Sequence, residues 1–213
     1  MTELNPKLER YILEHIDPED DLLYELNRFT HLKIMHPRML SGHLQGKILR
    51  MISLMIKPHL VLEIGTYTGY SAICLAQGMS KDGHLHTIEV NDELVDIPQQ
   101  YFTKFGLTEK ITLHVGDAKE IIPTLPYGFD LVFMDGEKSE YLDYYNMVFD
   151  KIIPGGFILA DNILWSGKVL EKEASNDYFT KGIKRFNNFV KEDRRVEKVI
   201  LPIRDGLMIL RKL

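Results

Sequence analysis

Apolar positions in the first 57 residues recur at helical spacing and predict three helices. The first covers Asn5–Ile16. The second begins at Asp17-Pro18-Glu19, where Asp can cap a helix and Pro suits its first turn, and it is broken at His36-Pro37. The third follows Ser41 as its cap and ends before Pro58. It carries an apolar stripe made of Leu44, Ile48, Met51 and Met55.

Beyond residue 57, short apolar runs alternate with helical ones. Five runs read as strands: His59–Ile64, His84–Val90, Ile111–Val115, Phe129–Met134 and Gly156–Ala160. Four helices are expected between them: Ser71–Met79, Leu94–Phe105, Ala118–Leu125 and Tyr141–Ile152. Continuous apolar strands separated by helices predict a parallel sheet with both faces covered.

The end of the chain follows a different pattern. The apolar runs Val196–Leu201 and Leu207–Leu210 are separated by only five residues, too few for a crossover helix. They predict an antiparallel hairpin. We therefore expect one α/β domain over residues 1–213, with a helical cap at 1–57 and a Rossmann-like core of seven mostly parallel strands at 58–213.

A turn with two glycines follows the first predicted strand. Gly65 and Gly69 lie between the apolar run that ends at Glu63-Ile64 and a helical segment that starts near Ser71. Glycine lets the backbone approach a ligand closely and accept positive φ. The spacing G-x-x-x-G differs from the G-x-G-x-x-G that binds a pyrophosphate, so it favours a nucleoside ligand without one.

Two further strand ends supply polar groups beside the same crevice. Glu89 ends the second strand, 24 residues after Gly65, where an acid can accept both hydrogen bonds of a ribose diol. Asp117 and Ala118 follow the third strand, where an adenine would lie. Asp117 could equally be a helix cap.

Oxygen-bearing side chains end the fourth and fifth strands. Asp135 follows one, and Asp161-Asn162 follow the other. Carboxylate and amide oxygens suit a hard divalent cation such as Mg²⁺, Ca²⁺ or Mn²⁺, although an Asp at a strand end can also be a simple cap. Lys138 follows Asp135 by three residues. Beside a metal and a cationic ligand, its pKa would fall toward neutrality, as a general base requires. Alone, it would be solvated.

Composition is that of an ordinary globular chain, with 45% hydrophobic and 27% charged residues. No apolar run is long enough to span a bilayer, and the N-terminus is polar, so neither a membrane nor a signal peptide is expected. The single cysteine, Cys74, excludes an internal disulfide and suits a reducing compartment. These features predict a cytoplasmic protein.

Charge is distributed unevenly around a net value of −5. Residues 27–62 contain no acid and six basic residues, which are Arg28, Lys33, Arg38, Lys47, Arg50 and Lys57. This acid-free window is either a solvated helical surface or a face for an anionic substrate or partner.

In combination, these motifs resemble the cation-dependent class I S-adenosylmethionine O-methyltransferases, the family of the caffeoyl-CoA and catechol O-methyltransferases. The resemblance rests on six segments, which are EIGTYTGYS (63–71), TIEV (87–90), GDA (116–118), FDLVFMDGEK (129–138), PGGFILADNILWSG (154–167) and LPIRDG (201–206). They run in family order from about residue 39 to the C-terminus.

The resemblance implies a role for each matching position. The cofactor S-adenosylmethionine would contact residues before and within the glycine turn and at the strand ends, namely Met39, Ser41, Glu63, Gly65, Thr66, Tyr67, Ser71, Glu89, Asp117, Ala118, Asp135 and Glu137. Asp135, Asp161 and Asn162 would hold the divalent cation, with Mg²⁺ preferred. Lys138 and Asp135 would be the catalytic residues, and Trp165 and Ser166 would face the substrate, although Trp165 could simply pack.

Two positions depart from the family pattern. Glu137 replaces an Asp, and Ser166 replaces the Asn of plant members, so the plant substrate does not carry over directly. The expected acceptor is an aromatic diol or its CoA ester, and a homodimer is implied. Two alternatives are a tRNA hydroxyuridine O-methyltransferase, docked by the acid-free window, and a non-enzymatic S-adenosylmethionine-binding protein. An NAD-dependent dehydrogenase is disfavoured by the glycine spacing and the hairpin.

Overall fold

The computed structural model describes residues 5–172 and 174–213, so the first four residues of the predicted helical cap lie outside the described residues. The α-helices are α1 Pro6–Glu14, α2 Asp21–Lys33, α3 Gly42–Ile56, α4 Tyr70–Ala76, α5 Asp96–Lys104, α6 Ala118–Ile121, α7 Tyr141–Phe149 and α8 Tyr178–Glu192. The strands are β1 Leu60–Ile64, β2 His84–Glu89, β3 Ile111–Val115, β4 Phe129–Met134, β5 Ile152–Ala160, β6 Val196–Leu201 and β7 Leu207–Lys212. None of the helices in this part of the chain is both long and apolar enough to cross a membrane.

The seven strands have the order β3-β2-β1-β4-β5-β7-β6. β1 pairs with β4, β4 with β5, and β2 with β3 in parallel, whereas β7 runs antiparallel to both β5 and β6. The mostly parallel sheet and its C-terminal antiparallel hairpin confirm the predicted fold class.

Contacts within the chain group it into two compact units. Among the described residues, the first unit contains 60–65 and 117–213, and the second contains 5–59 and 66–116. This grouping differs from the division predicted at residue 57, and the expectation of one domain stays a prediction. Each unit is described below by itself.

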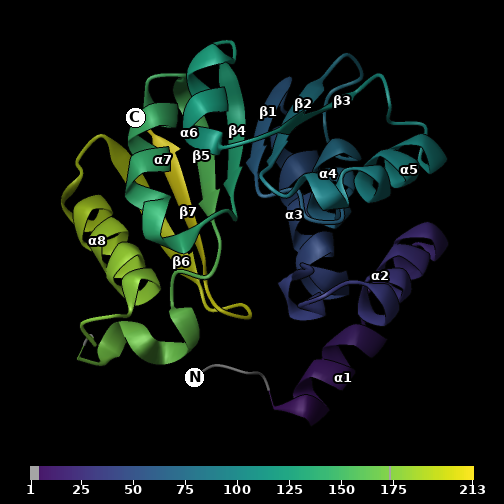
Figure 1. Cartoon of the computed structure of the whole chain (residues 1–213), viewed down its shortest axis with the longest axis horizontal. Helices are drawn as coiled ribbons and strands as arrows, with labels where there is room; N and C mark the ends of the chain where they lie inside the picture. The colour runs from purple at the N-terminus through teal and green to yellow at the C-terminus, as the bar shows by residue number, and fades with distance from the viewer. Residues whose placement is uncertain (1–4, 173) are drawn as a thin grey trace. The chain divides into compact units, whose positions relative to one another are not determined.

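In the first unit, large aromatic side chains fill the space between the strands and two helices. α7 and α8 lie side by side (Figure 1). Tyr145 of α7 and Phe186 of α8 are fully buried, with ring centroids 5.9 Å apart, and Phe129 and Phe133 of β4 are equally buried. This packing holds the carboxyl end of β4, which carries the acidic candidate residues.

In the second unit, α3 packs against α4 (Figure 1). Small residues line this contact. A Cβ at Gly46 would lie 2.5 Å from Cε1 of Tyr70, and Ser53 Oγ donates to Leu75 O at 2.7 Å. The small side chains therefore let the two helices approach closely. The predicted apolar stripe of α3 does not face this contact, since Met51 and Met55 are exposed.

Several elements differ from those predicted. α2 begins at Asp21 rather than at residue 17, because Asp20 is its cap and accepts the amide of Leu22 at 2.9 Å. Ser41 precedes α3 but does not cap it with its side chain. β5 begins at Ile152, where the fourth predicted helix was expected to end, and α8 was not predicted.

Candidate active site

Gly65 allows the end of β1 to lie against the end of β4. Its φ is +101°, and a Cβ there would lie 2.5 Å from the carbonyl oxygen of Asp135. The amide of Asp135 in turn donates to Ile64 O at 2.9 Å. Gly65 therefore fixes where Asp135 leaves the sheet, and Glu63 beside it is fully buried.

The rest of the glycine turn, in the second unit, is bound to the end of β2. The amide of Tyr67 donates to Glu89 Oε2 at 2.6 Å, and the amide of Thr66 donates to Ile88 O at 3.1 Å. Thr66 Oγ1 and Thr87 Oγ1 are 2.5 Å apart. Tyr67 itself has a φ of +51°, in the left-handed region that residues with a side chain seldom occupy.

Glu89 is held by backbone donors on both of its oxygens. Besides the amide of Tyr67, the amide of Asn91 donates to Glu89 Oε1 at 2.9 Å. Glu89 is only 7% exposed. An ionised carboxylate offers about four acceptor positions, so two remain for further donors. Glu89 is therefore oriented and still able to accept the two hydroxyls of a diol.

Other predicted cofactor residues of the second unit lie near the same turn or under it. The hydroxyl of Tyr67 donates to Met35 O at 3.0 Å, which joins the turn to the segment that carries Met39 and Ser41. Met39 is 59% exposed, whereas Ser41 and Ser71 are buried. Met39 is thus the accessible member of this group.

In the first unit, Lys138 contacts the candidate residue Asp135 and also Tyr141, which the sequence analysis did not select. Its Nζ donates to Asp135 Oδ1 at 2.6 Å and to the Tyr141 hydroxyl at 2.9 Å. The Tyr141 hydroxyl lies 3.1 Å from both Met134 O and Asp161 O. One chain of contacts therefore joins the ends of β4 and β5.

The charges of this group depend on one another. Burial disfavours the charged form of Lys138, but the charge of Asp135 and the contact with Tyr141 outweigh it, so the pKa of Lys138 lies above its ordinary value. The expectation of a lowered pKa concerns Lys138 beside a metal and a cationic ligand, so it stays a prediction. Burial, aided by the charge of Asp161, raises the pKa of Asp135 to about 6 against the opposing effect of Lys138.

Asp161 and Asn162 follow β5 as predicted. Asp161 is 4% exposed, and its Oδ1 accepts the amide of Asn162 at 2.8 Å; Asn162 itself has a φ of +59°. No group of three His, Cys, Asp or Glu side chains suited to a metal occurs among residues 5–172 and 174–213. The predicted ligand set differs from such a group, since it has two carboxylates and one amide. Its oxygen donors fit a hard cation.

The remaining predicted residues of this unit have local structural roles. Asp117 caps α6 by accepting the amide of Lys119 at 2.7 Å, and Ala118 is buried. Glu137 is exposed and accepts both the amide and the hydroxyl of Ser139, at 3.2 and 2.9 Å. These caps are compatible with cofactor contacts but do not require them.

Trp165 and Ser166 lie in a strained turn after the acidic residues. Both have positive φ, and the amide of Ser166 donates to Asp205 Oδ1. The Trp165 ring packs edge-on against Phe179, and its buried indole N–H has no hydrogen-bond partner among the described residues. The indole is therefore packed and retains a donor.

Sequence reasoning missed three residues that shape this group. Tyr141 is fully buried under Lys138, Asp205 fixes Ser166, and a Cβ at Gly182 of α8 would lie 2.5 Å from Lys138 O. The LPIRDG segment marked Asp205 without giving it a role. Nothing in the local sequence points to Tyr141 or Gly182, because both act through contacts distant along the chain.

Comparison with known proteins identifies the family of the chain. The sequence model of a family described as O-methyltransferase matches residues 14–213. A catechol O-methyltransferase of Niastella koreensis is 31% identical over 92% of this chain and 90% of its own length. Caffeoyl-CoA O-methyltransferase 2 of Eucalyptus globulus is 31% identical over 96% of this chain and 88% of its own. The crystal structure of an O-methyltransferase from Bacillus cereus in complex with SAH has a TM-score of 0.90 at 25% identity, covering 97% of both chains.

Proposed function

The chain belongs to the O-methyltransferase family, and we propose that it methylates a hydroxyl of a catechol-like or caffeoyl-type aromatic with the help of a divalent cation. The methyl donor is S-adenosylmethionine, in keeping with the related enzyme that holds SAH. The observation that carries the finer proposal is the cluster in which Lys138 contacts Asp135 and, through Tyr141, reaches Asp161. A dehydrogenase or a purely non-enzymatic binding protein does not fit this family.

For the cofactor, the strongest proposal concerns Glu89. Its carboxylate is pre-oriented by two amides and keeps acceptor positions for a ribose diol. The other proposed contacts are those of the glycine turn and its neighbours, namely Met39, Ser41, Glu63, Gly65, Thr66, Tyr67, Ser71, Asp117, Ala118, Asp135 and Glu137. A sulfonium cofactor supplies an activated methyl group.

For the metal, the proposed ligands are Asp135, Asp161 and Asn162. Both carboxylates come from little-exposed positions, and the charge of Asp161 reaches Asp135. A divalent cation bound there, with Mg²⁺ preferred over Ca²⁺ or Mn²⁺, would stabilise the oxyanion of the acceptor and lower the pKa of its hydroxyl.

For the proton, the proposed acceptor is Lys138 Nζ. In this structure Asp135 holds the amine as an ammonium, so the role requires that the charge of Asp135 be offset when ligands bind. Tyr141 positions the lysine by accepting a hydrogen bond from its Nζ, and Gly182 of α8 allows close packing against its backbone. Trp165 and Ser166 are proposed to contact the acceptor.

A second candidate acceptor is a hydroxyuridine of tRNA. The acid-free window 27–62 favours it, because Lys and Arg without acids attract phosphates. We further propose a cytoplasmic homodimer, as the family resemblance implies.

The test is methyl transfer from labelled S-adenosylmethionine to catechols, caffeoyl-CoA and tRNA with or without 5-hydroxyuridine, in Mg²⁺ and in EDTA. We expect transfer to a catechol or CoA ester that EDTA abolishes and Mg²⁺ restores. Asp161→Asn should lose this metal response. Undiminished transfer in EDTA would contradict the metal role. Transfer only to tRNA, falling steeply with salt, would replace the small-molecule acceptor.

A further inference from the structure

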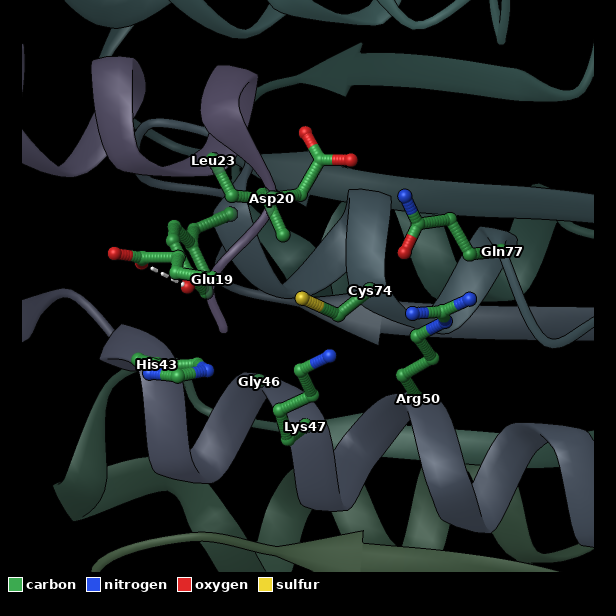
Figure 2. A pocket seen from close by; sticks show the side chains of 10 residues that line it. Glu19, Asp20, Leu23, His43, Gly46, Lys47, Arg50, Cys74 and Gln77 are labelled. Carbon is green, nitrogen blue, oxygen red and sulfur yellow. Dashed lines mark hydrogen bonds between the residues drawn. The ribbon is translucent and has the colours of Figure 1, made fainter. Parts of the chain in front are cut away.

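A cavity in the second unit lies among the start of α2, α3 and α4 (Figure 2). Its interior measures only about 20 Å³, and it opens to solvent, so that the whole empty region at its mouth is about 260 Å³. Its lining residues are Glu19, Asp20, Leu23, His43, Gly46, Lys47, Arg50, Tyr70, Cys74 and Gln77. None of them belongs to the candidate active site, so the cavity is a separate feature.

Two cationic side chains of α3 and the side-chain amide of Gln77, which directly follows α4, line the cavity. Lys47 and Arg50 are one helical turn apart, and Figure 2 shows both reaching toward the side of the cavity where Cys74 and Gln77 lie. Lys47 Nζ is 3.9 Å from Asp17 Oδ2, at the limit of an ion pair, and that carboxylate is 86% exposed. Its charge is therefore only weakly compensated.

Two polar atoms of the lining are buried without any partner in the described chain. They are Nε of Arg50 and Oε1 of Gln77. Buried polar groups in folded proteins are nearly always satisfied by protein, water or ligand. One N–H donor and one amide oxygen on the walls of the same cavity thus lack partners, which indicates that a polar guest forms hydrogen bonds with these side chains.

The two acids of the lining are already engaged. Glu19 Oε1 accepts the Tyr70 hydroxyl at 2.5 Å and Asn27 Nδ2 at 3.2 Å. Asp20 Oδ1 accepts the amide of Leu22 as the cap of α2. Both carboxylates keep their charge, but these donors orient them, and in the described chain neither forms an ion pair with Lys47 or Arg50.

We propose that the open mouth of this cavity binds a small oxyanion, of the size of phosphate or a carboxylate group, through Arg50 and Lys47. Arg recognises planar or tetrahedral oxyanions by its fork of N–H donors, and Lys adds a point charge. Rotation of the Gln77 amide about its last bond offers an N–H₂ donor to the same guest. Lys47 and Arg50 both belong to the acid-free window, and α3 carries no Asp or Glu that could pair with them. The window therefore supplies the positive charge of this site.

The single cysteine of the chain is a built-in reporter of this site. Cys74 lines the cavity, is 1% exposed, and is the only thiol in 213 residues. The rate at which a small reagent such as methyl methanethiosulfonate labels the protein therefore reports on this cavity alone. An oxyanion bound beside the sulfur should slow that rate.

The experiment titrates the full chain with phosphate, sulfate, acetate or chloride at constant ionic strength, following Tm and Cys74 labelling. We expect at least one oxyanion to raise Tm saturably and to slow labelling, whereas chloride does neither. Preference for phosphate over acetate, or the reverse, identifies the guest as a phosphate or a carboxylate.

Variants assign the effect to the cavity. Arg50→Gln should weaken oxyanion binding about tenfold or more, since a charge-assisted contact is lost. Arg28→Gln is the matched control, because Arg28 is an exposed arginine in the same window, outside the cavity. It should bind as the native chain does. If Arg50→Gln does not fold, Lys47→Gln and Gln77→Leu test the proposal instead, and both should weaken oxyanion binding.

Three results would overturn the proposal. They are no saturable response beyond that of chloride, undiminished binding by the folded cavity variants, and stabilisation that leaves Cys74 labelling unchanged. The first would mean that water alone completes Arg50 and Gln77. The other two would place the anion elsewhere on the molecule.

Discussion

Lys138 Nζ lies 2.6 Å from Asp135 Oδ1, and the two groups are both largely buried. A buried ammonium and carboxylate in contact support each other's charge, so neither can be removed alone without cost. This contact combines a proposed proton acceptor with a proposed metal ligand, which makes its disruption the most direct test of the site.

Lys138→Met should lower methyl transfer by about 10²–10⁴-fold, the range for loss of a general acid or base. It should also destabilise the protein by about 3–5 kcal/mol, since Asp135 is left buried without its partner. Rates of transfer and urea unfolding curves check both effects. Lys138→Met combined with Asp135→Asn should regain stability but not transfer. Recovery of transfer in the double variant would contradict the assigned role.

Glu89→Gln should weaken S-adenosylmethionine binding by about 10–100-fold, since an ionised acceptor for the ribose is lost. Isothermal titration with the cofactor or with SAH measures this directly. Glu93→Gln is the control, because Glu93 is an exposed acid in the segment just after β2. If both variants bind equally well, Glu89 only shapes the turn through Tyr67 and Asn91.

His86 should make the protein less stable in mild acid. Burial, with the nearby charges of His84 and His114, lowers its pKa to about 4, and the pKa of His114 is lowered for similar reasons. The unfolded chain therefore takes up protons below pH ~6.5, where the folded chain does not. The contribution of His86 to the free energy of unfolding should be constant above that pH and fall from there toward pH 4.

Urea unfolding of the native chain and of His86→Gln at several pH values checks this. The variant should show a shallower loss between pH ~6.5 and 4. His31→Gln, which removes an exposed histidine of α2, should keep the native slope. An equal slope in all three proteins would mean that other groups govern acid stability.

Asp193 should stabilise the first unit at neutral pH. It accepts from Arg195 Nε at 2.9 Å and from the Tyr145 hydroxyl at 2.9 Å, and these contacts hold its pKa below the ordinary value against the opposing effect of burial. Asp193→Asn should cost about 1–3 kcal/mol, measured by urea unfolding at pH 7. Glu192→Gln, at an exposed neighbour, should cost almost nothing.

The pH dependence of that loss has a definite sign. Because the pKa of Asp193 is lower in the folded than in the unfolded chain, its contribution is fully present above pH ~3.9 and disappears as the pH falls through the folded value. The difference between native protein and Asp193→Asn should therefore shrink in strong acid. A difference that grows there would contradict the assignment.

The sequence by itself determined the succession of strands and helices along the chain, the hairpin and the family. These properties depend on local patterns: apolar runs of strand length, glycines where φ must be positive, and a linker between β6 and β7 too short for a helix. It also identified Asp135, Asp161 and Lys138 as residues that follow neighbouring strands. That they form one group could be expected, because the carboxyl ends of parallel strands lie at the same edge of a sheet.

Only the tertiary structure decided which groups contact each other. Tyr141 beneath Lys138, Gly182 of α8 against the turn at Lys138, and the close approach of α3 and α4 at Gly46 all join segments whose spacing along the chain carries no periodic signal. The charge of Lys138 was likewise decided there, because a pKa depends on burial and on neighbours rather than on residue type. Local patterns specify elements, whereas packing chooses the faces and partners that those elements use.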